Sequence, residues 1–428
     1  MNTIVVLMAL LLLSYLGSFL ASGRGLRATA GLPSGSELIV LGIIAGPLVF
    51  GAVTRSSLES FDPLLYVATG WIALSIGLNY GHVDDRRVPL GRMVAGISLS
   101  LLCGGIVAVG VWLSIPFVAT MDATSRVLLA GGMGAACAET TRLAMQWVVE
   151  RYDAKGPLTE LLSDLSQSDE VVPIGVLALL YSLRPPAHAT VNLPPLGWAG
   201  ATVVVGVLLG IATAALLARD LRTGESWGTI LGTSLMTIGL AARLDLAAIT
   251  AMFSLGATIA VGSRHQRDIQ QMVSTTERAV MMPALVLAGA RIDPSNIGRL
   301  GLLIPVALLL RFGAKFAVGF ALRSSQRAAK GAPPLLGLGL VSSGGMTICI
   351  GLALALRFPG AVGDTVLATA VAVTLAGELA GPLALRRVLV STGEIVEPAP
   401  ISAPPDEEPE DHDELPPDEE HPSEGAPS

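Results

Sequence analysis

The sequence predicts an all-α membrane protein with about thirteen transmembrane helices, and three observations support that class. Of the 428 residues, 52% are hydrophobic and only 14% are charged, and the mean hydropathy is +0.65. Glycine is abundant and aromatic residues are few, which suits helices that pack closely through small residues. The sequence also lacks the alternating segments of about ten residues that are typical of membrane β-barrels.

Apolar stretches of about 20 residues, the length that a helix needs to cross about 30 Å of hydrocarbon, mark the predicted crossings. The first is predicted to be a helix and not a signal peptide, because it lacks a basic start and a clear cleavage site. The spans run approximately 3–22, 36–53, 63–81, 92–116, 126–149, 157–184, 194–218, 225–242, 245–262, 276–291, 299–322, 334–356 and 362–387.

The charges of the loops predict the orientation of the chain. Alternate loops place sixteen Lys and Arg residues on one side and seven on the other. The positive-inside rule therefore predicts an external N-terminus and a cytoplasmic C-terminus in the cell inner (plasma) membrane. Residues 1–395 form the predicted transmembrane domain, and residues 396–428, which are acidic and rich in Pro, form a disordered cytoplasmic tail.

Four basic residues lie inside spans or at their ends: Arg142, Arg278, Arg311 and Lys315. An ionisable group at membrane depth is expected to have a partner and a function. Arg311 and Lys315 are four residues apart and share one helix face. Because Lys315 is far from either end of its span, we expect it to be a buried cation that pairs with an anion.

Two adjacent carboxylates, Asp169 and Glu170, precede an apolar run. Leucines at 158, 161, 162 and 165 form a stripe, so one helix of about 42 Å can run from 157 to 184 with the acids near its middle. Its polar face, with Glu160, Ser163, Asp164, Ser166, Gln167 and Ser168, is then expected to line water. In the alternative, the helix begins near residue 168 and its dipole stabilises acids at its N-terminus.

Six segments in order resemble the monovalent cation/proton antiporter superfamily, in its bacterial sodium/hydrogen exchanger-like branch. They cover most of residues 30–395, and no soluble nucleotide-binding regulatory domain is expected in residues 396–428. The segments are SGSELIVLGIIAGP (34–47), the acid pair with its Val-rich run, VLAGARIDP (286–294), RFGAKFAVG (311–319), LGLGLVSSGGMTICIGLAL (336–354) and AGELAGPLALRRVLVSTGEI (376–395).

The resemblance implies inverted repeats with two discontinuous helices that cross at the bilayer midplane, in a core bundle beside a scaffold bundle. The candidate breaks are in the fifth and twelfth spans, where Ser, Thr and Gly suit interrupted helices. Their residues are Glu139, Thr140 and Thr141, and Ser342, Ser343, Gly344 and Gly345. Many relatives have Thr-Asp or Thr-Ser-Pro where this chain has Glu139-Thr140-Thr141, and Glu139 can instead pair with Arg142 on one helix face.

The resemblance also implies roles for the charged residues. Glu170 matches the acid that carries the ion and the proton, although relatives often have Asp-Asp or Asn-Asp here. Asp169 matches the acid that pairs with a buried lysine in electrogenic relatives, and Lys315 matches that lysine, with Arg311 beside it. A register shift of one residue makes Asp169 the carrier instead.

The function that follows is exchange of a monovalent cation, sodium or potassium, for protons by alternating access, with a role in pH homeostasis. A carboxylate that holds either a proton or a cation, but not both, exchanges them. The expected partners are these ions, the lipid bilayer and a second copy in a homodimer, with no nucleic acid.

Two alternatives stay open: a sodium-coupled solute symporter, and a non-transporting membrane sensor or scaffold with an antiporter-like fold. An enzyme is not expected, because the five His residues lack metal-ligand spacing and no nucleophile motif is present. No cofactor is expected, and no metal beyond the transported cation.

Overall fold

The computed structural model describes most of the predicted transmembrane domain. The chain divides into Met1–Ile395 and Val396–Ser428. The predicted tail lies outside the described residues, as does the first predicted span except for Leu12. The described residues are 12, 35–47, 49, 55–83, 86–184, 192–218 and 223–395.

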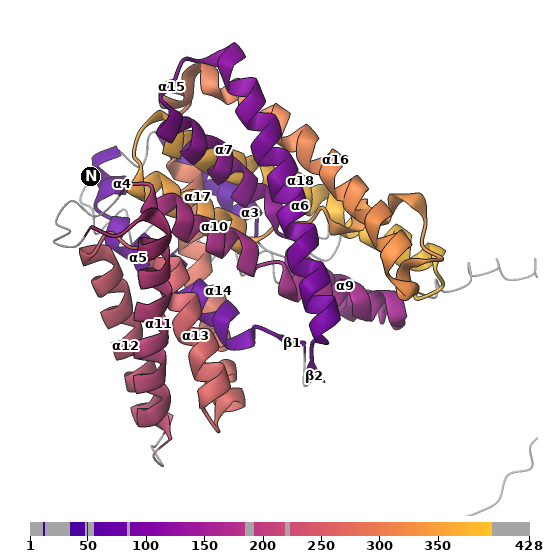
Figure 1. Cartoon of the computed structure of the whole chain (residues 1–428), viewed down its shortest axis with the longest axis horizontal. Helices are drawn as coiled ribbons and strands as arrows, with labels where there is room; N and C mark the ends of the chain where they lie inside the picture. Colours follow the sequence, from indigo (N-terminus) through magenta and orange to yellow (C-terminus); the bar gives the residue numbers. More distant parts are fainter. Residues whose placement is uncertain are drawn as a thin grey trace, which may run out of the picture. The chain divides into compact units, whose positions relative to one another are not determined.

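The described part of the first unit is helical, with one two-stranded antiparallel ribbon, β1 (His82–Val83) and β2 (Arg86–Arg87). Figure 1 shows the order of the elements. The helices are α3 (Glu37–Ala45), α4 (Arg55–Glu59), α5 (Asp62–Asn79), α6 (Leu90–Val118), α7 (Ala123–Ala138), α8 (Arg142–Tyr152), α9 (Pro157–Ser168), α10 (Val171–Ser182), α11 (Pro195–Leu217), α12 (Thr223–Arg243), α13 (Ala248–Gly262), α14 (Gln266–Ala290), α15 (Pro294–Ile297), η1 (Gly298–Leu302), α16 (Leu303–Ser325), η2 (Arg327–Ala329), η3 (Pro334–Leu340), α17 (Gly345–Arg357) and α18 (Ala361–Ser391).

Two groups of helices pack mainly among themselves. The scaffold bundle comprises α3, α5 and α11–α14, and the core bundle comprises α6–α10 and α15–α18 with the short helices between them. In Figure 1, α11, α12 and α13 lie side by side on one flank, and α6, α16 and α18 lie on the other. The two bundles meet where α17 packs on α5 and α14, and where α10 packs on α11 and α13.

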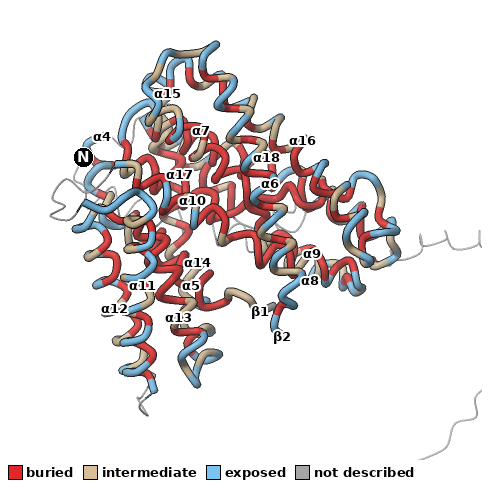
Figure 2. The backbone as a smooth tube through the Cα atoms, in the orientation of Figure 1, coloured by how far each residue is buried: buried red, intermediate tan, exposed pale blue. Residues whose placement is uncertain are grey.

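Burial follows this arrangement. Figure 2 shows buried residues concentrated on α7, α10, α17 and α18. In contrast, α6 exposes Leu101, Leu113 and Phe117, which is the pattern of a helix that faces lipid. The chain is therefore an all-α membrane protein, as the sequence predicts.

Within the described residues, four helices are long and apolar enough to cross a membrane by themselves: α6, α11, α18 and the stretch Pro294–Ser325. Counting η3 and α17, which meet at 58°, as one broken span gives five. Three predicted spans are each interrupted, with breaks at 139–141, 169–170 and 341–344. The first and third are the two discontinuous helices expected from the resemblance, whereas the second is not expected.

Glycine allows the scaffold helices to touch backbone to backbone. A Cβ on Gly42 of α3 would lie 2.0 Å from the carbonyl oxygen of Val286 in α14, and a Cβ on Gly289 would lie 2.1 Å from that of Ile39. Any larger residue at either position would force α3 and α14 apart. The high glycine content thus acts as predicted, through close helix approach.

Candidate functional site

The two interrupted helices contact each other at their breaks. α7 ends at Ala138 and α8 begins at Arg142, while η3 ends at Leu340 and α17 begins at Gly345. The amide of Thr141 donates to the carbonyl of Ser342 at 3.1 Å, and Thr140 Oγ1 donates to the carbonyl of Leu340 at 3.2 Å. The breaks therefore satisfy part of each other's freed backbone groups.

Arg311, which is 0% exposed, lies where the two helices end. Its guanidinium donates to the carbonyl of Cys137 in the last turn of α7 and to that of Glu139 just after it, the latter at 2.9 Å. It also donates to the carbonyls of Val341 at 2.9 Å and Ser342 at 3.3 Å after η3. A cation is favourable at the C-terminus of a helix, where carbonyl groups lack partners.

Lys315 lies one turn further along α16 and also contacts the break after α7. Its ammonium donates to the carbonyl of Ala138 at 3.1 Å and to Thr140 Oγ1 at 2.8 Å. The predicted shared face of Arg311 and Lys315 is thus present. Two glycines bring α16 this close, because a Cβ on Gly319 would lie 2.2 Å from the amide nitrogen of Gly337.

Glu139 caps the N-terminus of the other interrupted helix. Its Oε1 accepts from the amides of Gly344 and Thr347, both at 3.1 Å, and from Thr347 Oγ1 at 2.7 Å. The alternative pairing with Arg142 is wrong, since Arg142 donates to Gln167 Oε1 at 3.1 Å instead. An anion at an α-helix N-terminus gains from the helix dipole as well as from these bonds.

The other residues predicted at the helix crossing, Ser342, Ser343 and Gly345, are buried at the break before α17. Ser343 Oγ lies 2.9 Å from Thr347 Oγ1, and Ser342 is 0% exposed. A Cβ on Gly345 would lie 2.3 Å from the sulfur of Met281 in α14. Gly345 thus lets the start of α17 approach the scaffold bundle.

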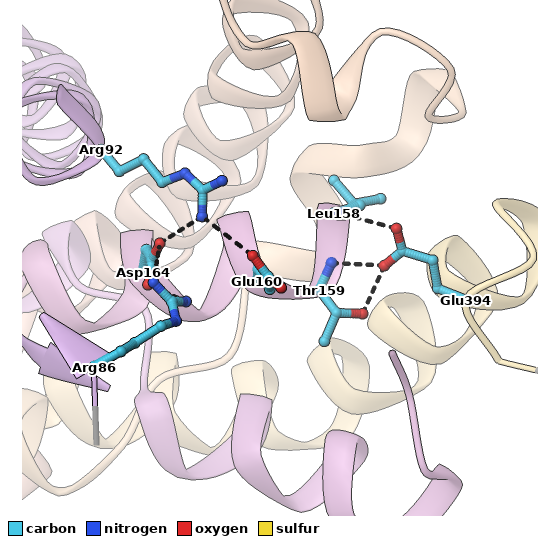
Figure 3. Close-up of polar contacts among 7 residues, drawn as sticks. All are labelled: Arg86, Arg92, Leu158, Thr159, Glu160, Asp164 and Glu394. Atoms are coloured by element: carbon cyan, nitrogen blue, oxygen red, sulfur yellow. Dashed lines mark hydrogen bonds and ion pairs between the residues drawn. The ribbon is translucent and has the colours of Figure 1, made fainter. Parts of the chain in front are cut away.

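Two sets of contacts hold α9, the helix that precedes the acids (Figure 3). The carboxylate of Glu394 caps its N-terminus, accepting from the amides of Leu158 at 2.8 Å and Thr159 at 2.6 Å. Near the middle, the fully buried Asp164 accepts from Arg86 and Arg92, each at 2.7 Å. These contacts fix the position of the acid pair that follows.

Asp169 and Glu170 lie at the interruption between α9 and α10 and are 5% and 7% exposed. Pro173 explains the interruption, because it lacks the N–H that would bond to the carbonyl of Asp169. Ser100 Oγ donates to that carbonyl at 3.1 Å instead. The helix thus begins at residue 157, as in the first alternative, but it breaks at the acids.

Four of the six residues on the polar face of α9 contact protein, contrary to the expectation of a water-lined face, whereas Glu160 is exposed and Ser163 is partly exposed. Asp164, Ser166, Gln167 and Ser168 are all 1% exposed or less. Gln167 Nε2 donates to the carbonyl of Asn79 at 2.9 Å, and Ser168 Oγ donates to that of Asp164 at 2.6 Å.

Asp169 and Lys315 do not form the expected direct pair. No ion pair within 4.0 Å joins them, because Thr140 lies between: its amide donates to Asp169 Oδ2 at 2.9 Å, and its hydroxyl accepts from Lys315. Both residues line one cavity of about 10 Å³. Asp169 Oδ1 is buried without a hydrogen-bond partner among the described residues.

Glu170 faces a different cavity, which has about 20 Å³ of room for the centre of a water molecule. Glu139, Arg142 and Glu277 are among its lining residues. No hydrogen bond or ion pair of the Glu170 side chain is found within the described part of the chain. A space of this size holds one water or one ion of similar size.

Sequence reasoning missed Glu277 and Ser75. Ser75 Oγ donates to Glu277 Oε2 at 2.6 Å, which links α5 to α14 beside the cavity. The sequence does contain a signal for Glu277: it is an acid just inside the predicted span 276–291, and an acidic residue at that depth is as strong a functional candidate as a basic one.

Two interrupted helices crossing beside buried charges define a class of membrane-protein fold. The chain shares its fold with solved structures of a sodium proton antiporter. Two solved structures of the sodium proton antiporter MjNhaP1 from Methanocaldococcus jannaschii are similar to it. The structure at pH 8 has a TM-score of 0.67 and 16% identity, over 90% of this chain and 100% of that chain. The electron-microscopy structure has a TM-score of 0.61 and 16% identity, over 92% and 96%.

At this level of identity the likeness shows the fold. No family model matches the chain, and no match to a curated protein was found.

Proposed function

We propose that the chain is a secondary active transporter that exchanges a monovalent cation, sodium or potassium, for protons by alternating access. The observation that carries this proposal is Glu170: a buried carboxylate without a hydrogen-bond or ion-pair partner among the described residues, beside the helix crossing and facing a cavity of about 20 Å³. Such a carboxylate binds a proton or a hard cation at the same oxygens, so each displaces the other. The likeness to the sodium proton antiporter structures supports the same activity.

Glu170 is the carrier in this proposal, and Asp169 is the acid linked to Lys315 through Thr140. Arg311 and Lys315 hold the ends of the interrupted helices and offset the negative charge nearby. The small cavity favours an ion over the organic solute of a symporter. An ion-sized site also favours transport over a sensor or scaffold, which needs no such cavity.

The proposal includes the setting of the transporter. Residues 1–395 form the exchanger domain in the cell inner (plasma) membrane, with the N-terminus outside and residues 396–428 as a cytoplasmic tail. The charge of the loops supports this orientation. A homodimer and a role in pH homeostasis are expected from the resemblance alone.

The test is cation-dependent proton movement in proteoliposomes that contain the full chain and a pH-sensitive dye. Glu170→Gln removes the charge but keeps the shape, and we expect movement to fall to the level of protein-free liposomes. Glu160→Gln is the matched control, because Glu160 lies on α9 with 61% of its side chain exposed. If Glu170→Gln exchanges as well as the wild type does, Glu170 is not the carrier.

A further inference from the structure

Glu277 is held in place from the scaffold bundle. Ser75 of α5 donates to its Oε2, and next to it Trp71 Nε1 donates to Thr276 Oγ1 at 3.0 Å. These two bonds join α5 and α14 on one face. Glu277 therefore stays with the scaffold bundle if the core bundle moves.

The cavity beside Glu277 contains more negative than positive charge. Three of its lining residues are carboxylates, Glu139, Glu170 and Glu277, and one is a guanidinium, Arg142. In the described chain, no ion pair within 4.0 Å joins Arg142 to any of the three.

Glu139 points to a ligand independently of this charge. The residue is 1% exposed, it lines the cavity, and its Oε2 has no hydrogen-bond partner among the described residues. A buried carboxylate oxygen without a donor is costly unless a proton or a cation binds it. The cavity therefore has both the charge and an open oxygen for a cation.

The arrangement of the three carboxylates favours a cation that binds them one after another over a cation that binds all three at once. Within the described residues, no group of three His, Cys, Asp or Glu residues is placed to hold one metal ion together. A cation in a space of about 20 Å³ thus meets the carboxylates in turn. Glu277 belongs to the scaffold bundle, whereas Glu139 and Glu170 belong to the core bundle.

We propose that Glu277 is a scaffold-side ligand that binds the monovalent cation as it enters the cavity and passes it to Glu170. This inference rests on the proposed function. Ser75 lies four residues before the end of α5, and Glu277 lies in the first half of α14. The end of α5 and the start of α14 adjoin basic loops that contain Arg86 and Arg264, and the positive-inside rule places such loops in the cytoplasm. Glu277 therefore sets the apparent cation affinity on the cytoplasmic side. Carboxylate oxygens are suitable ligands for hard cations.

The test titrates NaCl, LiCl or KCl against choline chloride at constant ionic strength, on the cytoplasmic face of proteoliposomes. In Glu277→Gln, we expect the half-saturating cation concentration to rise at least about tenfold, the loss expected for one charged contact. The maximal rate at saturating cation remains, because Glu170 is intact. A purely structural defect would lower the maximal rate instead.

Two further variants sharpen the result. Glu277→Asp keeps the charge and gives a smaller rise. Asp268→Asn removes a charge from the same helix, at a residue whose side chain is 79% exposed, and leaves the half-saturating concentration unchanged. If Glu277→Gln fails to fold, Glu277→Asp and Ser75→Ala are measured in its place. In each, the half-saturating cation concentration is expected to exceed the wild-type value.

Binding can also be measured without transport. A cation that binds only the folded state raises its thermal stability with the logarithm of one plus the ratio of cation concentration to Kd, so the detergent-purified Glu277→Gln protein needs more NaCl than the wild type for the same shift. A half-saturating concentration within about threefold of the wild-type value overturns the role of Glu277 and leaves the proposed function standing. If the wild type shows no cation-dependent proton movement, the proposed function fails and this inference fails with it.

Discussion

Arg311 donates to four backbone carbonyls at the ends of α7 and of η3, and Lys315 donates to a fifth. These bonds explain how two buried cations are tolerated at membrane depth without a carboxylate in direct contact. Both cations bind carbonyl groups at the break after α7, which contains Glu139 and also Thr140, the residue whose amide donates to Asp169. The cations are thus part of the architecture of the site as well as of its charge balance.

At the residue scale, Lys315→Met tests the link to Asp169. The pH of half-maximal exchange should rise, because ionising a carboxyl group costs more without a positive neighbour. The free energy of unfolding should fall by about 1–3 kcal/mol, since the Ala138 carbonyl and Thr140 Oγ1 each lose the hydrogen bond from the ammonium. The measurements are exchange against pH in proteoliposomes and thermal unfolding in detergent.

Lys330→Met is the control, because Lys330 is exposed and lies outside both cavities. A pH profile in Lys315→Met that matches the wild-type profile would contradict the assigned role of Lys315.

Sequence predicted part of this site. The four-residue spacing of Arg311 and Lys315 correctly predicted their shared face. The predicted direct contact between Lys315 and Asp169 was wrong, because Thr140, at the break after α7, lies between them. No local sequence pattern encodes a neighbour so distant along the chain. Glu277 was not predicted because it lies next to the start of the predicted span 276–291, where a charged side chain can also reach water.

At the element scale, close contact between α16 and η3 brings Arg311 and Lys315 to the breaks. Gly319→Ala should lower the free energy of unfolding by about 1–3 kcal/mol, because its Cβ would overlap the backbone of Gly337. Exchange should weaken as well, since α16 and its two cations must shift. Thermal unfolding and proton movement are the measurements.

Gly313→Ala, on the same helix, is the matched control. A Cβ at Gly313 meets nothing within 4 Å, so stability should stay the same or rise by up to about 1 kcal/mol from helix propensity. Equal effects of the two substitutions would show that the close approach of α16 to η3 does not determine stability or exchange.

Helix interruptions were only partly predictable. Windows of about 20 residues average over a break of two to four residues, so hydropathy alone cannot detect one. The Ser-Ser-Gly-Gly and Glu-Thr-Thr runs predicted two breaks through the family resemblance, and both are present. The third was missed although Pro173, four residues after Asp169, is the physical signal for it.

At the scale of the whole molecule, the cavity lined by Glu139, Glu170 and Glu277 lies where the core and scaffold bundles meet, with carboxyl groups from both. Movement of one bundle against the other would therefore open or close the cavity without unfolding either bundle. The fold class followed from composition and span length. The division into two bundles did not, because it depends on contacts between residues far apart in the sequence.

In the proposed mechanism, one buried carboxylate site holds either a proton or a cation. The most direct measurement is the half-saturating Na⁺ or K⁺ concentration for exchange by the full chain in proteoliposomes, determined at several pH values. Competition predicts that this concentration rises as the pH falls, in proportion to the proton concentration, while the maximal rate stays constant. A half-saturating concentration that is the same at every pH would contradict the claim.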